Sequence, residues 1–253
     1  TLRRTVDITV VIPSVTIPES IGLTGDEPPR HTNPHNFPVL YLLHGYGNNH
    51  ATWTGYTNVE LYAEERNIAV VMLSAENKFY IDHGNNDLFY EFIENELPDF
   101  ITGMFPISQR PEDTFIAGLS MGGYGTLVHA LGNPEKYRAF GSFSGAVKVN
   151  PNSPFSGETG EIDPKNDPLD LAKRLSASGK PFPEMYIACG DQDMVIEANR
   201  TFVAELRAMG QTPTWDEVPG YGHEWRFWNL QVERFLDWIP RTDFYADGGR
   251  RQV

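Results

Sequence analysis

Short apolar runs alternate with longer amphipathic segments along this chain, and this alternation constrains its fold more than any other feature. The clearest runs cover residues 37–45, 67–74, 114–120, 139–147 and 184–190, and a shorter, more polar one lies at 213–218. A continuous apolar run predicts a strand that is covered on both faces of a sheet. Because these runs alternate with helical segments, we expect an α/β fold with a mostly parallel central sheet and helices on both faces.

The segments between the runs have the apolar spacing of helices. Helices are predicted at 58–66, 87–105, 121–133, 167–177, 195–210 and 224–239. Pro98 is expected to interrupt the second of them, since proline lacks the N–H group that a helix interior needs. At the N-terminus, the β-branched stretch 5–18 predicts an edge hairpin or a pair of antiparallel strands.

Length and composition favour one domain. A chain of 253 residues, 40% of them hydrophobic, can bury a sizeable core, and we expect a single domain over 1–253. The polar stretch 148–166 is predicted to be a surface loop, with an insertion that covers a cleft as the alternative. The polar tail 241–253 is predicted to be peripheral.

The net charge of the chain excludes some classes of binding partner. The chain has 20 basic and 34 acidic residues, and its net charge of −14 repels phosphate backbones and anionic membrane surfaces. We therefore expect neither a nucleic-acid partner nor a membrane partner. The single cysteine, Cys189, allows no internal disulfide, and no apolar run is long enough to span a bilayer. A cytoplasmic protein is expected, with a secreted protein whose signal has been removed as the alternative.

The stretch AGLSMGGYG, at 117–125, places a serine among glycines. Ser120 follows a predicted strand and precedes a predicted helix, which is the setting of a nucleophile elbow. Gly118 and Gly122 lack a Cβ atom, so the strand and the helix can approach closely around the serine. The N-terminus of the helix would also present partial positive charge to an oxyanion. Ser120 is therefore the predicted nucleophile.

A serine hydroxyl needs a base to act as a nucleophile, and the base needs an acid to orient it. At an elbow of this kind, the acid and then the histidine follow the serine along the chain. Only His129 and His223 follow Ser120, and His129 is interpreted as a residue of the helix face or core. His223, in the glycine-rich loop PGYGHEW, is the predicted base. Asp193 is the predicted acid, with Asp191 as the alternative.

Acyl transfer also needs donors for the oxyanion. The backbone N–H of Met121, directly after the nucleophile, is one predicted donor. The second is expected in the loop LLHGYGNN after the first central strand, where the N–H of Tyr46 follows Gly45. Trp53 and Trp225 lie near these catalytic loops in sequence. They are predicted to line an acyl or alcohol pocket, with packing in the core as the alternative.

Four segments together resemble a known family. YLLHGYGNNHATW, GLSMGGYG, CGDQDMVIEANRTF and PGYGHEWRFWNLQVERFLDWI are similar to motifs of the esterase D group of the α/β-hydrolase superfamily. The resemblance runs from residue 37 to 240 and is greatest to the tributyrin-type acetyl esterases, so it implies an α/β-hydrolase fold. The nucleophile, acid, base and oxyanion donors of the family fall on Ser120, Asp193, His223, Tyr46 and Met121.

The resemblance implies a serine carboxylic-ester hydrolase that acts on short-chain acyl esters, including acetylated or feruloylated carbohydrates. An acyltransferase and an S-formylglutathione-type thioesterase are the alternatives, although S-formylglutathione hydrolases usually carry a different loop in place of HGYGNN. A peptidase and a non-catalytic binding module are further rivals. No cofactor is required, and no metal site is expected because His31 and His35 lack a recognisable ligand set. The family also suggests a homo-oligomer.

Overall fold

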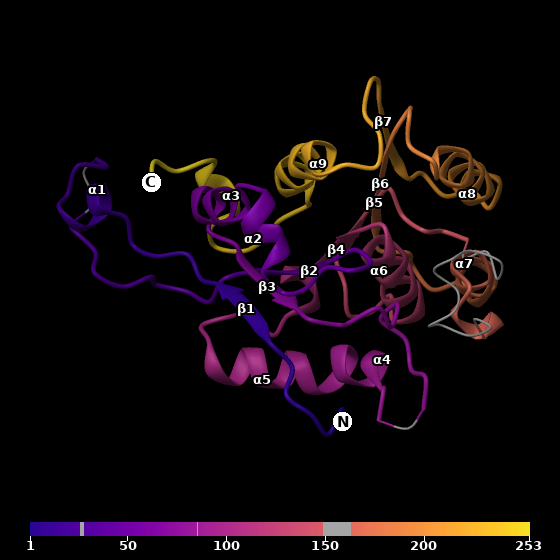
Figure 1. Cartoon of the computed structure of the whole chain (residues 1–253). Helices are drawn as coiled ribbons and strands as arrows, with labels where there is room; N and C mark the ends of the chain where they lie inside the picture. The colour runs from indigo at the N-terminus through magenta and orange to yellow at the C-terminus, as the bar shows by residue number, and fades with distance from the viewer. Residues whose placement is uncertain (26–27, 85, 149–162) are drawn as a thin grey trace.

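The computed structural model of the chain describes residues 1–25, 28–84, 86–148 and 163–253 (Figure 1). The described residues form a seven-stranded sheet in the order β1-β3-β2-β4-β5-β6-β7. The strands are β1 (Ile8–Val11), β2 (Val39–Leu43), β3 (Ala69–Leu73), β4 (Thr114–Leu119), β5 (Ala139–Phe143), β6 (Glu184–Gly190) and β7 (Thr214–Val218). Strands β2 to β7 pair in parallel, and only β1 within this sheet is antiparallel. The expected mostly parallel sheet is confirmed.

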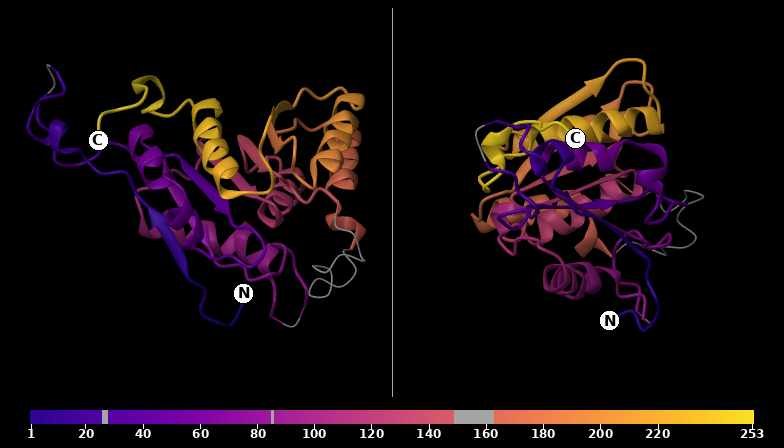
Figure 2. Two further views of the ribbon diagram at one scale, coloured as in Figure 1. Left: turned by 45° about the horizontal axis from the view of Figure 1, so that its top comes forward. Right: turned by 90° about the vertical axis from the view of Figure 1, so that its left-hand side faces the viewer.

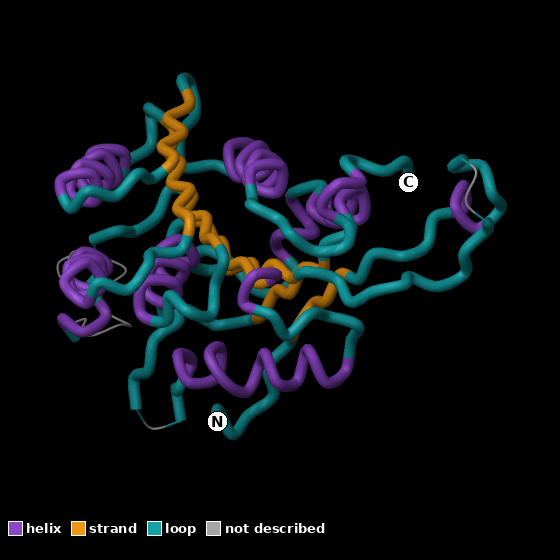
Figure 3. Tube along the Cα trace, turned by 180° about the vertical axis from the view of Figure 1, so that it is seen from behind, coloured by secondary structure: helices purple, strands orange, loops and turns teal. Residues whose placement is uncertain are grey.

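Helices cover both faces of the sheet, as Figure 3 shows from behind. The larger helices are α3 (Val59–Arg66), α5 (Leu97–Met104), α6 (Met121–Gly132), α7 (Pro168–Ser178), α8 (Ile196–Ala208) and α9 (Trp225–Trp238). The sequence predicted a helix in each of these places. It did not predict the short helix α2 (Thr52–Tyr56), which follows the loop after β2.

The side chains of β2 show how one apolar run serves two layers. Val39, Tyr41 and Leu43 pack in the cluster that includes apolar residues of α5, α6, α7 and α8. Leu40 and Leu42 point the other way and pack with residues of α2, α3 and α9. All five residues are buried, as a parallel strand between two helical layers requires.

The helical segment at 87–105 is not interrupted at Pro98. α4 (Phe89–Glu91) continues through a π-helical turn (Phe92–Glu96) into α5, which has Pro98 in its first turn. Proline has no N–H for the carbonyl of Glu94 four residues earlier. The ammonium group of Lys136 donates to that carbonyl instead, at 2.7 Å. The expected interruption is therefore wrong, because a wider turn and a substitute donor accommodate the proline.

The N-terminal segment forms one strand and not a hairpin. β1 pairs antiparallel with β3, with Ile8 opposite Leu73. Pro13 follows soon after β1 and cannot donate a backbone hydrogen bond to a second strand. The chain instead continues to the short helix α1 (Ile17–Ser20), at the end of an arm that projects from the sheet (Figure 2). The prediction of an antiparallel edge is confirmed and that of a hairpin is wrong.

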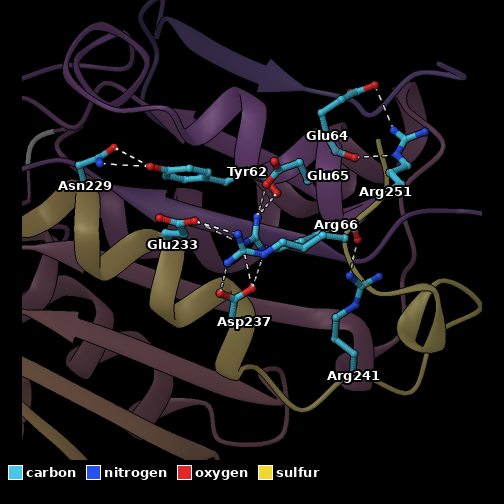
Figure 4. Close-up of polar contacts among 10 residues, drawn as sticks. Tyr62, Glu64, Glu65, Arg66, Asn229, Glu233, Asp237, Arg241 and Arg251 are labelled. Atoms are coloured by element: carbon cyan, nitrogen blue, oxygen red, sulfur yellow. Dashed lines mark hydrogen bonds and ion pairs between the residues drawn. The ribbon is translucent and has the colours of Figure 1, made fainter. Parts of the chain in front are cut away.

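Arg66, the last residue of α3, joins this helix to α9. Its side chain is only 4% exposed. The guanidinium donates to the Asp237 carboxylate at 2.8 Å, and to the Tyr62 carbonyl and the Glu65 carboxylate at 3.0 Å (Figure 4). These contacts hold α9, and with it the loop that precedes α9, against the rest of the fold.

Arginines also tie the C-terminal tail to α3. Arg251 donates to the backbone carbonyl of Glu64 at 2.7 Å and to its carboxylate at 3.0 Å, and it pairs with Glu19 of α1 at 3.0 Å. Arg241 donates to the backbone carbonyl of Arg66 (Figure 4). The predicted peripheral tail is thus an anchored surface segment. The predicted loop at 148–166 lies mostly outside the described residues.

Candidate active site

Ser120 lies in the sharp turn between β4 and α6. Its φ of 52° and ψ of −112° fall outside the regions that L-residues favour, so the turn is strained. Backbone hydrogen bonds hold it in place. The Ser120 N–H donates to the Phe143 carbonyl at 2.9 Å, and the Ser120 carbonyl accepts from the Tyr124 N–H at 3.0 Å. This backbone is the geometry that a nucleophile elbow requires.

Two glycines make this turn sterically possible. A Cβ atom at Gly118 would lie 2.6 Å from the carbonyl oxygen of Gly122. A Cβ atom at Gly122 would lie 2.4 Å from the carbonyl oxygen of Leu43, in the neighbouring strand. Real Cβ atoms do not approach backbone so closely, so only glycine lets α6 begin directly against β2 and β4.

His223 reaches the serine from the loop between β7 and α9. Its Nε2 lies 3.0 Å from the Ser120 Oγ. The His223 ring packs perpendicular to the indole of Trp228, with 5.0 Å between centroids. The loop runs directly over the end of β6, because a Cβ atom at Gly190 would lie 2.1 Å from the Tyr221 carbonyl. The imidazole side chain remains 20% exposed.

Asp193 lies behind the imidazole and contacts its other nitrogen. Both carboxylate oxygens lie 3.0 Å from the His223 Nδ1, and the carboxylate also accepts from the Val195 N–H at 3.0 Å. The Asp193 side chain is fully buried. Burial acts to raise the pKa of this carboxyl, but the hydrogen bond and charge of His223 outweigh it, so the pKa is lowered. An ionised Asp193 accepts from Nδ1–H, which leaves Nε2 able to accept the serine proton.

The other sequence candidates lie elsewhere. Asp191 accepts from the backbone N–H of Gly220 at 2.7 Å and so braces the loop that precedes His223. His129 is fully buried in α6 with its Nδ1 2.5 Å from Glu94. Neither residue joins the contacts of Ser120. The interpretation of His129 as a core residue agrees with this placement.

The two predicted oxyanion donors flank the elbow. Met121 is the first residue of α6, and the first N–H groups of a helix have no acceptor within it. Tyr46 lies in the loop after β2, just past Gly45, where a Cβ atom would collide with the Leu119 side chain at 2.4 Å. That close approach packs the loop against the strand end that carries Ser120.

Ser144 is a residue that sequence reasoning missed. It lies just after β5, is fully buried, and has a φ of 48°, which is unusual for a serine. Its Oγ accepts from the indole N–H of Trp228 at 3.2 Å, and its hydroxyl helps to lower the pKa of the Asp193 carboxyl. Backbone strain beside the carboxylate that contacts His223 marks Ser144 as a candidate functional residue. No pattern in the sequence around Ser144 reveals it.

The two predicted tryptophans have different surroundings. Trp53 is fully buried, and its indole N–H donates to the Leu43 carbonyl at 3.1 Å. It therefore offers no surface to a substrate. Trp225 is only partly buried and stacks on the exposed ring of Tyr56, with 5.1 Å between centroids and 15° between planes. The ring of Trp53 supports Trp225 edge-on from below, at 5.4 Å.

Two further findings concern partners. Among the described residues, no group of three or more His, Cys, Asp or Glu side chains could hold a metal ion. His31 and His35 are both exposed. In the same part of the chain, no helix combines the length and apolarity that crossing a bilayer would need.

The sheet and the elbow together define a class of protein. A mostly parallel sheet, with a strained serine at the end of its middle strand and a histidine in the loop after its last, is the α/β-hydrolase fold. Residues 14–239 match the model of the Esterase family, and the chain belongs to this family.

Individual relatives agree with this assignment. An acetyl esterase of Caldicellulosiruptor saccharolyticus is 31% identical over 237 residues, covering 84% of this chain and 87% of that protein. FphF, a fluorophosphonate-binding serine hydrolase of Staphylococcus aureus, has a TM-score of 0.78 at 27% identity, covering 92% of this chain and 91% of its own. The S-formylglutathione hydrolase FrmB of the same organism has a TM-score of 0.77 at 28% identity, with the same coverage. The chain is a serine carboxylic-ester hydrolase.

Proposed function

We propose that the chain hydrolyses short-chain carboxylic esters with Ser120 as nucleophile, His223 as base and Asp193 as the orienting acid. One observation carries the proposal. The three side chains form a continuous series of 3.0 Å contacts, from the buried Asp193 carboxylate through both nitrogens of His223 to the Ser120 hydroxyl. A serine held in this way can lose its proton as its oxygen attacks a carbonyl.

The chemistry follows from this series of contacts. His223 accepts the Ser120 proton as Oγ bonds to the ester carbon, and Asp193 stabilises the imidazolium that forms. The N–H groups of Met121 and Tyr46 would bind the tetrahedral oxyanion, aided by the positive end of α6. His223 then gives its proton to the leaving alcohol. Water attacks the acyl-enzyme by the same route and releases the acid, with Ser120 regaining its proton.

The proposed substrate is an acetyl ester of a ring-bearing alcohol, such as an acetylated sugar. The likeness to an acetyl esterase supports the acetyl group. Support for the ring comes from Tyr56 and Trp225, because aromatic faces bind the apolar faces of sugars and aryl groups. A succession of ring contacts leads from His223 through Trp228 to this pair. His223 protonates the leaving alcohol, so the alcohol portion should lie on this side.

Ser120→Ala tests the central proposal. The variant should lose hydrolysis of p-nitrophenyl acetate and labelling by a fluorophosphonate probe, since both need the same oxygen. Unchanged hydrolysis by Ser120→Ala would disprove the proposal. A series of p-nitrophenyl esters of increasing acyl length, together with methyl ferulate, would then show whether the acetyl group is preferred.

Tyr56 tests the substrate class separately. Tyr56→Ala should raise the KM for acetylated xylooligosaccharides several-fold, with little effect on ethyl acetate, which has no ring. Tyr56→Phe keeps the aromatic face and should behave as the wild type. Equal effects of Tyr56→Ala on both substrates would contradict the ring-binding role while leaving the esterase proposal intact.

A second candidate function is hydrolysis of S-formylglutathione. The likeness to FrmB, at 28% identity over most of both chains, favours it. The same three side chains can cleave a thioester, because the leaving thiol needs less help from His223 than an alcohol. The kcat/KM for S-formylglutathione compared with that for acetyl esters decides between the two, and an added alcohol acceptor would reveal acyl transfer to an acceptor other than water.

A further inference from the structure

His44 is a buried titratable residue that takes no part in the proposed proton transfers. It directly follows β2, where the loop that carries Tyr46 begins, and it is only 1% exposed. Burial lowers the pKa of His44 to about 4, so the ring is neutral at neutral pH. A buried imidazole that stays neutral must satisfy one donor and one acceptor within the protein.

The contacts of His44 fix which nitrogen carries the proton. Nε2 accepts a hydrogen bond from the backbone N–H of Ala75 at 3.0 Å, so it is the unprotonated nitrogen. Nδ1 lies 2.7 Å from the carbonyl oxygen of Gly45, which can only accept, so Nδ1 carries the proton. The His44 ring therefore links Ala75, in the loop after β3, to the carbonyl group of Gly45.

That carbonyl belongs to the peptide unit of Tyr46. The Gly45 C=O and the Tyr46 N–H lie in one plane, and in a trans peptide they point in opposite directions. The described residues contain no cis peptide. The Gly45 oxygen accepts from the His44 ring at 2.7 Å and from the Asn48 N–H at 3.2 Å, and these two hydrogen bonds together set the direction of the Tyr46 N–H, away from the ring.

We infer that His44 is a positioning residue, which aims the Tyr46 N–H at the oxyanion by hydrogen-bonding to the Gly45 carbonyl. The inference rests on the proposed function, since the oxyanion that this N–H would bind forms in acyl transfer. The role needs Nδ1–H alone. The bond from Ala75 to Nε2 selects the tautomer that has this proton.

The backbone of His44 also contacts the elbow. Its carbonyl oxygen accepts from the buried Tyr80 hydroxyl at 2.7 Å. A Cβ atom at Gly122, in the first turn of α6, would lie 2.7 Å from the same oxygen. The residue is thus packed between the loop of Tyr46 and the helix start that carries Met121. It sets the spacing of the two proposed donors as well as the direction of one.

Three substitutions of His44 test the contributions of its two ring hydrogen bonds separately. His44→Asn places an amide donor near the position of Nδ1, and His44→Gln places an amide oxygen near that of Nε2, while His44→Ala removes both. We expect kcat for p-nitrophenyl acetate to fall about thirtyfold in His44→Ala and His44→Gln, which lies below the loss of a whole oxyanion donor. His44→Asn should retain most of the wild-type kcat, and KM should change little in all three.

The inhibition constant of a trifluoromethyl ketone tests the positioning role, because it would not change in a folded variant if His44 only stabilised the fold. This inhibitor forms a tetrahedral oxyanion on Ser120, so its inhibition constant should weaken in parallel with kcat. His50→Asn, on the same loop but bonded to Thr9, is the matched control and should behave as the wild type. Thermal unfolding identifies variants that are not folded at the assay temperature.

The comparison of His44→Asn with His44→Gln decides whether the Nδ1–H of His44 has the inferred role. Retention of activity and inhibitor affinity in His44→Asn but not in His44→Gln supports the inference. The reverse order, or a folded His44→Ala with wild-type kcat, overturns it. Neither result affects the role of Ser120, which the Ser120→Ala variant tests independently.

Discussion

The part of the chain that the structure describes contains two histidine–carboxylate pairs, and one of these two faces the proposed substrate. His223 contacts Asp193 at 3.0 Å, and His129 contacts Glu94 at 2.5 Å. The pairs differ in what meets the second nitrogen. For His223 this is the Ser120 hydroxyl at 3.0 Å, and for His129 it is the Tyr80 carbonyl at 2.9 Å.

The difference explains why one pair suits catalysis and the other suits stability. A hydroxyl can give its proton to an imidazole and take it back, so His223 can move a proton. A carbonyl oxygen can only accept, so the second nitrogen of His129 has no hydroxyl with which to exchange a proton, and the ring acts as a cross-link. Solvent access follows the same division, because the His223 side chain is 20% exposed and that of His129 is fully buried. Pairing with a carboxylate therefore does not by itself identify a catalytic histidine.

The largest expected effect on the rate comes from replacing His223, and the replacement of His129 provides the comparison. His223→Ala should lower kcat/KM for p-nitrophenyl acetate by about five orders of magnitude, because no other base reaches Ser120 among its described contacts. His129→Gln should leave the kcat of the folded enzyme nearly unchanged. Steady-state rates normalised to folded protein measure both. A large loss of kcat in folded His129→Gln would refute the division of roles.

Asp193 and Asp191 should also differ in their effect on kcat. Asp193→Asn should lower kcat by about 10⁴-fold, because an amide can stabilise the wrong tautomer of His223. Asp191→Asn is the matched control two residues away, and its amide oxygen can still accept from the Gly220 N–H. Its rate should stay close to that of the wild type. If the two variants behaved in the opposite way, Asp191 would be the acid.

Glu94 should affect stability and not rate. Glu94→Gln breaks a buried ionic cluster with His129 and Lys136 and should lower the free energy of unfolding by about 3 kcal/mol, measured by urea denaturation. Burial acts to raise the pKa of Glu94, but His129 and then Lys136 outweigh it, so the pKa lies below 4.5. A lowered carboxyl pKa stabilises the fold above pH 4.5, and this stability is lost as pH falls through the folded pKa. The wild type should therefore lose more stability than Glu94→Gln over that acid range, and parallel curves would contradict the role of Glu94.

The smallest expected effect belongs to Ser144, which supports Asp193 from behind. Ser144→Ala removes the hydroxyl that helps to keep the pKa of Asp193 low and should lower kcat by about tenfold. Trp228→Phe keeps the ring beside His223 but removes the N–H that donates to Ser144, so its effect should be smaller. Rates that fall more in Trp228→Phe than in Ser144→Ala would show that the indole N–H does not act through Ser144.

The comparison of the two pairs also shows how far sequence reasoning reaches. The order of Ser120, Asp193 and His223 relative to strands and helices was enough to predict which side chains the fold brings together. His129 could be set aside because it lies on the helix that begins at the serine. Nothing in the sequence indicated Glu94 as its partner, since the two residues are 35 positions apart in the chain.

Other predictions failed where a distant group decides local structure. Pro98 was expected to break a helix, but Lys136 supplies a donor from another element. The N-terminal stretch was expected to form an edge hairpin or a pair of antiparallel strands, and it forms one strand, β1, that pairs antiparallel with β3. For Trp53 the sequence left a pocket-lining role and core packing open, and the structure buries it in the core. Its place in sequence near a catalytic loop does not determine which face of that loop it occupies.

The sequence by itself determined the elements, their alternation and the position of the elbow, because apolar periodicity and glycine placement act over a few neighbouring residues. Only the tertiary structure decided the tautomer of His44, the strain at Ser144 and the separate roles of His223 and His129. These properties depend on hydrogen-bond partners from elements far apart in the chain, such as Ala75, Trp228 and Tyr80. A hydrogen bond requires atoms within about 3 Å, and folding alone sets distances of that kind between remote residues.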